Sequence, residues 1–237
     1  MFIYKMKMGT TMKYQTILFD ADGTLLDFKR SEYEALSDVL KTFGIPETEE
    51  NHKLYSAANA EQWRLLEKGL VTKPQLRINR FVNFLNQIGF SASPSDMADC
   101  YTEALSKKSY LLDGAFSLCR DLSRSHDLYI ITNGFRYIQE GRFKPSAIAP
   151  FFKGVFISEN IGAEKPSPVF FDYVKAHIPQ FCIEKALVVG DSLSSDIEGG
   201  LRAGIDVCWY NPEGKPLPAN MGIHYTISAL SELPKIL

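Results

Sequence analysis

The chain has 237 residues, 45% of them hydrophobic and 23% charged, and its 26 basic and 28 acidic side chains give a formal net charge of −2. This composition excludes a disordered chain, a collagen-like repeat and a disulfide-stapled miniprotein. The near-neutral balance gives no reason to expect a nucleic-acid polymer or an anionic membrane as the partner. At roughly 150 residues per domain, the length predicts one large domain or a core with a smaller second unit.

The cysteines and the N-terminal segment give hypotheses about the cellular compartment. None of the four cysteines forms a C-x-x-C pair, and their spacing matches no zinc pattern. We therefore expect reduced thiols in a cytoplasmic protein, and no apolar run approaches the ~18 residues of a membrane span. Residues 1–11 precede a natural-looking start at Met12 and are interpreted as an extension or tag without a function.

The first predicted strand, Tyr14 to Phe19, is a short apolar run that ends in the polar segment Asp20-Ala21-Asp22-Gly23-Thr24. Residues 28–110 are then expected to form an all-helical insert. Its first helix has Ser31 and Glu34 as the predicted capping box and ends at Gly44. Three further helices are predicted over residues 49–68, 72–88 and 95–108.

From residue 111 onward, predicted helices and strands alternate. The helices are expected over residues 114–123, 135–148, 169–176 and 195–203, and the strands over residues 128–132, 154–157, 186–190, 206–209 and 225–227. Such alternation is typical of a parallel sheet with helices on both faces. The predicted fold is therefore α/β: a doubly wound parallel core, residues 12–27 and 111–237, interrupted by a four-helix cap, residues 28–110.

Ligands of such sheets bind beyond the carboxyl ends of the strands. The residues at those ends are Asp20, Asp22, Thr132, Asn133, Lys165, Asp191 and Asp196. Carboxylates that converge at one edge of the sheet repel one another unless a divalent cation lies among them. Hard oxygen ligands suit Mg²⁺, which also binds phosphate oxygens. The lysine, the hydroxyl and the amide would hold the remaining phosphate oxygens. The set predicts attack of a carboxylate on phosphorus.

These segments, in this order, resemble the four motifs of the haloacid dehalogenase (HAD) superfamily. The matching segments are Asp20-x-Asp22-Gly23-Thr24, Thr132-Asn133, Lys165-Pro166 and Gly190-Asp191-x4-Asp196. The helical insert looks like the type I cap of that superfamily, so the resemblance covers nearly the whole chain from Met12. Carbon–halogen dehalogenases lack an acidic residue two positions after the nucleophile, so Asp22 favours phosphate chemistry.

The resemblance implies a role for each residue. Asp20 would be the nucleophile that forms an aspartyl-phosphate, and Asp22 would be the general acid for the leaving alcohol and then the general base for water. The implied phosphate ligands are Thr132, Asn133 and Lys165, and the implied Mg²⁺ ligands are Asp20, the backbone carbonyl of Asp22, and Asp191. Asp196 would act through water or by orienting these ligands, and Thr24 would support the first loop.

The resemblance also implies a class of leaving group. The segment Thr132–Phe135 with Gln139 and Arg142, together with Cys208–Asn211, looks like the bacterial pyrimidine 5′-nucleotidase branch, which implies hydrolysis of small nucleoside 5′-monophosphates. The cap residues that could meet a base or sugar are Trp63, Arg64, Arg77 and Arg80, whereas Phe81, Phe84 and Tyr101 have the spacing of cap core residues.

Three readings of the chain stay open at this point. The first is an Mg²⁺-dependent phosphatase, the second a sugar-phosphate phosphatase or phosphoglucomutase-like phosphotransferase of the same fold, and the third a non-catalytic phosphometabolite-binding protein. Residue by residue, Asp22-Gly23 could be a simple turn, Lys165 a solvated loop lysine and Asp196 a helix-terminal acid. The sequence does not indicate an oligomeric state.

Overall fold

The computed structural model describes residues 12–237, so the interpretation of residues 1–11 as an extension or tag lies outside the described residues. Within them, one six-stranded sheet has the order β3-β2-β1-β4-β5-β6, and every neighbouring pair is parallel. The strands are β1 (Thr16–Phe19), β2 (Asp127–Thr132), β3 (Gly154–Ile157), β4 (Ala186–Gly190), β5 (Asp206–Tyr210) and β6 (Tyr225–Ile227). The predicted doubly wound α/β fold is confirmed. The chain reverses its direction of winding between β1 and β4, where such sheets bind ligands.

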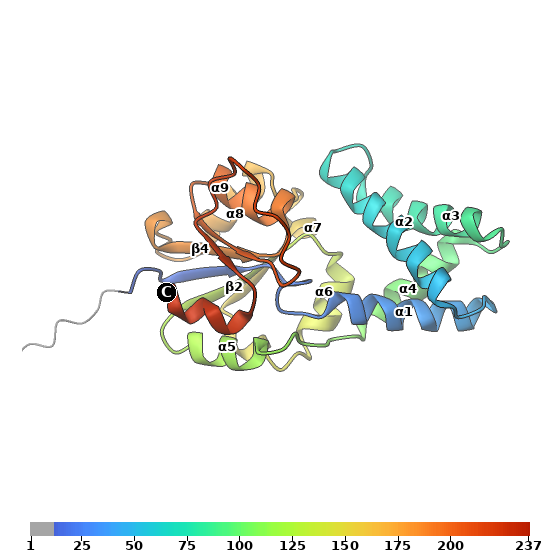
Figure 1. Cartoon of the computed structure of the whole chain (residues 1–237), viewed down its shortest axis with the longest axis horizontal. Coiled ribbons are helices and arrows are strands. Elements are labelled where there is room, and N and C mark those ends of the chain that lie inside the picture. The colour runs from blue at the N-terminus through green and yellow to red at the C-terminus, as the bar shows by residue number, and fades with distance from the viewer. Residues whose placement is uncertain (1–11) are drawn as a thin grey trace, which may run out of the picture.

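Helices cover both faces of the sheet (Figure 1). The core helices are α5 (Ala115–Leu122), α6 (Arg136–Phe143), α7 (Ser158–Ile161), α8 (Pro168–His177) and α9 (Glu198–Arg202). Alternate residues of β1 point to opposite faces: Ile17 and Phe19 pack with α5 and the C-terminal 3₁₀ turn, whereas Leu18 packs with α8. All four β1 residues are buried, as expected for a strand between two helical layers.

Four helices stand to one side of the sheet (Figure 1) and bury a hydrophobic cluster of their own. They are α1 (Phe28–Phe43), α2 (Glu49–Glu67), α3 (Lys73–Ile88) and α4 (Pro94–Ser106). Phe81, Phe84 and Tyr101 are fully buried in this cluster, as predicted. We call residues 28–110 the cap and keep these bounds as a proposal.

The chain enters and leaves the cap through two segments that lie side by side, residues 25–27 and 110–112, which we call the two crossings. The backbone N–H of Asp27 donates to the carbonyl of Tyr110 at 2.9 Å, and the N–H of Leu112 donates to the carbonyl of Leu25 at 2.9 Å. The cap is not isolated from the sheet layer, because α4 packs against α6 and Ile138 of α6 is buried in the cap cluster.

The predicted capping box of Ser31 and Glu34 is wrong. Helix α1 begins one turn earlier, at Phe28, and its N-cap is Asp27, whose carboxylate accepts from the N–H of Arg30 at 3.0 Å. Aspartate is among the strongest N-cap residues, so Asp27 competes successfully for the helix start. Ser31 lies inside the helix, and its hydroxyl donates to the carbonyl of Asp27 at 2.7 Å.

Two predicted core helices also have wrong bounds. The helix expected over 135–148 ends at Phe143, with Lys144 as its C-cap, because Pro145 has no backbone N–H with which to continue the helical hydrogen bonds. The helix expected over 195–203 instead begins with a π-helical turn, Leu193–Ile197, and continues as α9. Such π turns occur often at functional sites. Among the described residues, no helix is long and apolar enough to cross a membrane.

Candidate active site

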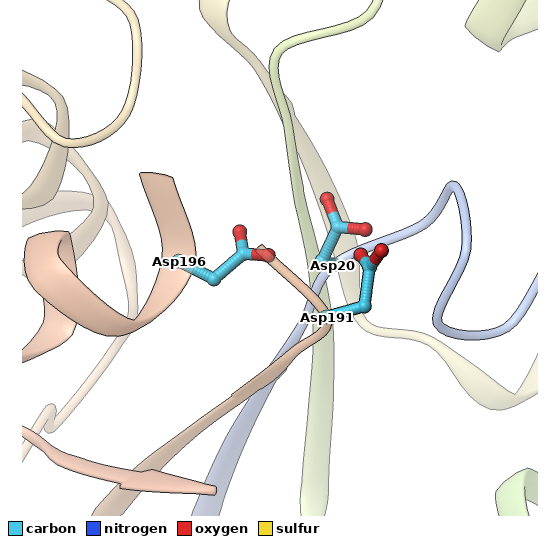
Figure 2. A group of neighbouring side chains, drawn as sticks. All are labelled: Asp20, Asp191 and Asp196. Atoms are coloured by element: carbon cyan, nitrogen blue, oxygen red, sulfur yellow. The ribbon is translucent and has the colours of Figure 1, made fainter. Parts of the chain in front are cut away.

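Three carboxylates meet at the carboxyl edge of the sheet. Asp20 follows β1 and Asp191 follows β4, and these strands are neighbours with Phe19 paired to Val189. Figure 2 shows the two side chains next to each other, with Asp196 pointing toward them from the π-helical turn. One oxygen from each of the three carboxylates lies within 4.8 Å of the others. The strand order thus brings together residues that are up to 176 positions apart, from Asp20 to Asp196.

Lys165 is the cation that holds this cluster together. Its ammonium Nζ donates to Oδ1 of Asp20 at 2.7 Å, to Oδ1 of Asp196 at 2.6 Å and to the carbonyl of Ile131 at 2.8 Å. The side chain is 1% exposed. Burial alone would lower the pKa of Lys165, but Asp196 and Asp20 raise it above its ordinary value. The lysine therefore stays charged, and the interpretation as a solvated loop lysine does not fit its burial.

One lysine does not satisfy three acids, of which Asp20 and Asp196 are buried and Asp191 is half-buried. Burial, followed by the charge of Asp196, raises the pKa of Asp191 to about 7, and burial raises the pKa of Asp20 well above its usual value despite Lys165. Within residues 12–237, Thr24 is the one side chain that donates to the Asp191 carboxylate, at 3.3 Å. The site therefore has an excess of carboxylate over cation beside Asp20 and Asp191.

Mg²⁺ fits this donor set. Magnesium binds hard oxygen ligands and usually takes only one or two carboxylates from the protein, and Asp20 and Asp191 offer two. Asp196 is less available, because its Oδ1 accepts from Lys165 at 2.6 Å and its Oδ2 accepts from the N–H of Ser192 at 3.1 Å. This arrangement supports the expectation that Asp196 orients the site and that Asp20 and Asp191 would hold the ion.

Gly23 brings the first loop against the second acid. It has φ +87°, and a Cβ at this position would lie 2.7 Å from Oδ2 of Asp191. Only glycine combines this backbone conformation with so close an approach. Gly23 is thus required for the loop that carries Asp22 to reach Asp191.

The side chain of Asp22 lies outside the acidic cluster. Its Oδ2 accepts from Nε2 of Gln139 at 2.6 Å, and its Oδ1 forms an ion pair with Nη1 of Arg142. The sequence connects Gln139 and Arg142 only with the nucleotidase branch and misses their contact with Asp22. The available signal is their i, i+3 spacing on α6, the first helix after Thr132, which puts them on one helix face.

The predicted phosphate ligands occupy the neighbouring strand end. Asn133 donates from Nδ2 to the carbonyl of Lys165 at 2.8 Å and accepts at Oδ1 from the N–H of Lys165 at 2.8 Å. The Oγ1 of Thr132 accepts from the N–H of Gly134 at 3.0 Å and from Nε2 of Gln139 at 3.1 Å. Asn133 thus fixes the backbone that carries Lys165, and Thr132 lies beside the residue that holds Asp22.

A cavity of about 220 Å³ opens over these groups. From the cap, its lining includes Phe28, Trp63 and Glu67. Glu67 accepts from the hydroxyl of Ser194 at 2.8 Å, so the end of α2 contacts the loop between Asp191 and Asp196. The cap therefore contributes one wall of the cavity.

Of the four cap residues proposed to meet a base or sugar, only Trp63 lines this cavity. Arg64 pairs with Glu61 on the surface, and Arg77 pairs with Asp99. Arg80 is 2% exposed and donates to Oδ1 of Asn59 at 3.2 Å inside the cap.

The sequence matches a known family over most of its length. The model of the haloacid dehalogenase-like hydrolases matches residues 14–204. The chain belongs to the haloacid dehalogenase-like hydrolases. It is 40% identical over 225 residues to YfnB of Bacillus subtilis, named as a HAD-hydrolase, with 95% of this chain and 96% of YfnB covered.

Two further HAD relatives carry names that state an activity. Pyrimidine 5′-nucleotidase PynA of Streptococcus pneumoniae is 39% identical over 202 residues, with 85% of each chain covered. Pyrimidine 5′-nucleotidase YjjG of Escherichia coli is 30% identical over 226 residues, with 95% of this chain and 99% of YjjG covered. The suspected HAD membership is confirmed, and the suspected branch agrees with these relatives.

A solved HAD structure resembles this chain closely. The crystal structure of B. subtilis YfnB bound to magnesium superposes with a TM-score of 0.91 and covers 95% of this chain and 99% of that one. A dehalogenase at 17% identity superposes with a TM-score of 0.73, which shows the shared fold alone.

Proposed function

We propose that the chain is a Mg²⁺-dependent phosphatase that hydrolyses small phosphomonoesters through an aspartyl-phosphate, with pyrimidine nucleoside 5′-monophosphates as its substrates. The observation that carries the proposal is the buried carboxylate of Asp20, held by Lys165 next to Asp191, at the switch point of the sheet. The names of PynA and YjjG support the substrate class. The magnesium in the YfnB structure supports the ion.

In this proposal, Asp20, Asp22 and Lys165 have different roles in the reaction. Lys165 donates to Oδ1 of Asp20, which orients the carboxylate and leaves Oδ2 to attack phosphorus as the bond to the leaving oxygen breaks. Asp22 donates a proton to that oxygen and later takes one from the water that attacks the aspartyl-phosphate, so phosphate leaves and Asp20 is regenerated. A Mg²⁺ ion held by Asp20, the backbone carbonyl of Asp22, and Asp191 would supply positive charge for the phosphoryl oxygens.

Metal removal is expected to abolish phosphate release, and added Mg²⁺ should restore it. The binding itself can be measured without activity: saturating Mg²⁺ should raise the melting temperature of the wild type, because a ligand that binds only the folded state stabilises it. Asp191→Asn should lose most of that rise, because Asp191 supplies a carboxylate without a cationic partner among the described residues. Asp113→Asn, which removes an exposed carboxylate just after the second crossing, is the control. Full activity in excess chelator would contradict the metal role.

The substrate class is tested with a panel of esters. Purified protein with Mg²⁺ is assayed for phosphate release from uridine, thymidine, cytidine, adenosine and guanosine 5′-monophosphates and from hexose phosphates. We expect kcat/KM for the pyrimidine nucleotides to exceed that for the purine nucleotides by roughly tenfold or more, since one pocket must reject a larger ring system. A preference for hexose phosphates would contradict the nucleotidase proposal. Conversion of a hexose 1-phosphate without free phosphate would indicate a mutase.

A further inference from the structure

Arg142 is a fully buried cation, and its guanidinium makes specific polar contacts. It is 0% exposed, lies on α6 and points between the core and the cap. A buried guanidinium is costly unless its N–H groups are paired. Each of its three nitrogens has a partner, and the three partners belong to three different segments.

The first partner belongs to the active site, and the other two belong to the base of the cap. Nη1 pairs with Asp22, Nε donates to the carbonyl of Lys108 at 2.9 Å, and Nη2 lies 3.4 Å from the hydroxyl of Ser31. Ser31 is in the first turn of α1, and Lys108 follows α4, so both adjoin the two crossings. The Arg142 guanidinium also lies 5.9 Å from the ring of Phe28, which lines the active-site cavity.

The shape of the guanidinium makes these contacts interdependent. Its five N–H donors are arranged in a rigid planar fork, so the position of the Lys108 carbonyl and of Ser31 constrains where Nη1 can be. Ser31 further ties the two crossings together, because its hydroxyl lies 2.7 Å from the carbonyl of Asp27 and 3.3 Å from the carbonyl of Lys108. A displacement at the base of the cap would therefore move the Arg142 guanidinium and, with it, the carboxylate of Asp22.

We propose that Arg142 is a positioning residue that ties the carboxylate of Asp22 to the two crossings, so that the placement of the cap sets the placement of the general acid. The inference rests on the proposed function, since it needs Asp22 to protonate the leaving oxygen. Gln139 holds the other oxygen of Asp22 from the same helix face, so α6 supplies both donors. Of these two side chains, Arg142 is the one that also contacts the base of the cap.

Esters with different leaving groups distinguish a positioning role of Arg142 from a general loss of structure in its variants. An acidic phenol such as p-nitrophenol departs without a proton, whereas the alkoxide of a nucleoside 5′-monophosphate needs one. The ratio kcat/KM covers the steps up to release of the alcohol, so it reports Asp22 as an acid and omits the later hydrolysis. A residue that acts through Asp22 therefore affects the two esters unequally.

The experiment compares kcat/KM for p-nitrophenyl phosphate and uridine 5′-monophosphate in the wild type, Arg142→Gln and Arg142→Lys. We expect Arg142→Gln to lose about 100-fold on the nucleotide, in the range of a general acid, and less than about threefold on the aryl ester. Lysine keeps the charge but reaches fewer partners, so Arg142→Lys should lose about tenfold on the nucleotide alone, and it decides the test if the glutamine variant does not fold. Arg120→Gln, which removes an exposed arginine beside Asp121, is the control.

Equal losses on both esters in the Arg142 variants, or no loss on the nucleotide, would overturn the positioning role while leaving the phosphatase proposal intact. A wild type that releases phosphate from neither ester would overturn the proposed function and this inference with it. A smaller loss of kcat/KM on the nucleotide in Arg142→Lys than in Arg142→Gln supports the charge-mediated contact between Arg142 and Asp22.

Discussion

Replacing Asp20 with asparagine is expected to lower kcat by about four orders of magnitude or more, as loss of a covalent nucleophile does in enzymes that use one. The amide has nearly the same shape as the carboxylate, so the side chain still fits beside Lys165, whose Nζ lies 2.7 Å from Oδ1. What is lost is the negative charge and with it the nucleophilic carboxylate oxygen that attacks phosphorus. The measurement is steady-state phosphate release with Mg²⁺ present.

The matched control is Asp127→Asn, at the start of β2, where the carboxylate pairs with exposed Lys153 far from the cavity. It should keep full activity, because a surface ion pair contributes little to stability and nothing to the site. Residual turnover of Asp20→Asn within about tenfold of the wild type would show that another group attacks phosphorus.

Replacing Lys165 with methionine is expected to cost both stability and activity. Methionine keeps the length and the apolar stem but leaves Asp20 and Asp196 without the ammonium that contacts both. Breaking a buried pair by removing one partner typically costs about 3–5 kcal/mol, because a buried charge is left uncompensated. The free energy of unfolding, measured by urea denaturation in the presence of chelator, should fall by that amount, and kcat should fall by roughly 100-fold or more.

Two comparisons test the cause. Lys153→Met removes a half-exposed partner of Asp127 and should cost less than about 1 kcal/mol. The double variant Lys165→Met with Asp196→Asn should recover part of the loss, because it removes one of the two orphaned charges. Simple addition of the two single costs would show that the Lys165–Asp196 contact does not matter for stability.

Much of the acidic site could be predicted because it depends on strand ends. Asp20 and Asp191 each directly follow a strand of the parallel sheet, so sheet geometry alone brings them to one edge, whereas Lys165 lies in the loop beyond β3 and α7. The predicted roles for these residues remain proposals, but their convergence is observed.

The helix contacts of the site were harder to predict. Nothing local in the sequence shows that Gln139 and Arg142 reach the carboxylate of Asp22, because this depends on how α6 rotates against the first loop. Likewise, the π-helical turn that carries Asp196 has no simple periodic pattern, so the sequence predicts an ordinary helix there. Pro145, which lacks a backbone N–H, is the signal in the sequence for the end of α6.

Chemical trapping of the intermediate tests the central claim most directly. The enzyme with Mg²⁺ is mixed with a nucleoside 5′-monophosphate carrying radiolabelled phosphate, quenched in acid within one turnover, digested and mapped. We predict label on the peptide that contains Asp20, and none in Asp20→Asn. Full release of phosphate with no labelled Asp20, or with label on another residue, would contradict an aspartyl-phosphate at this site.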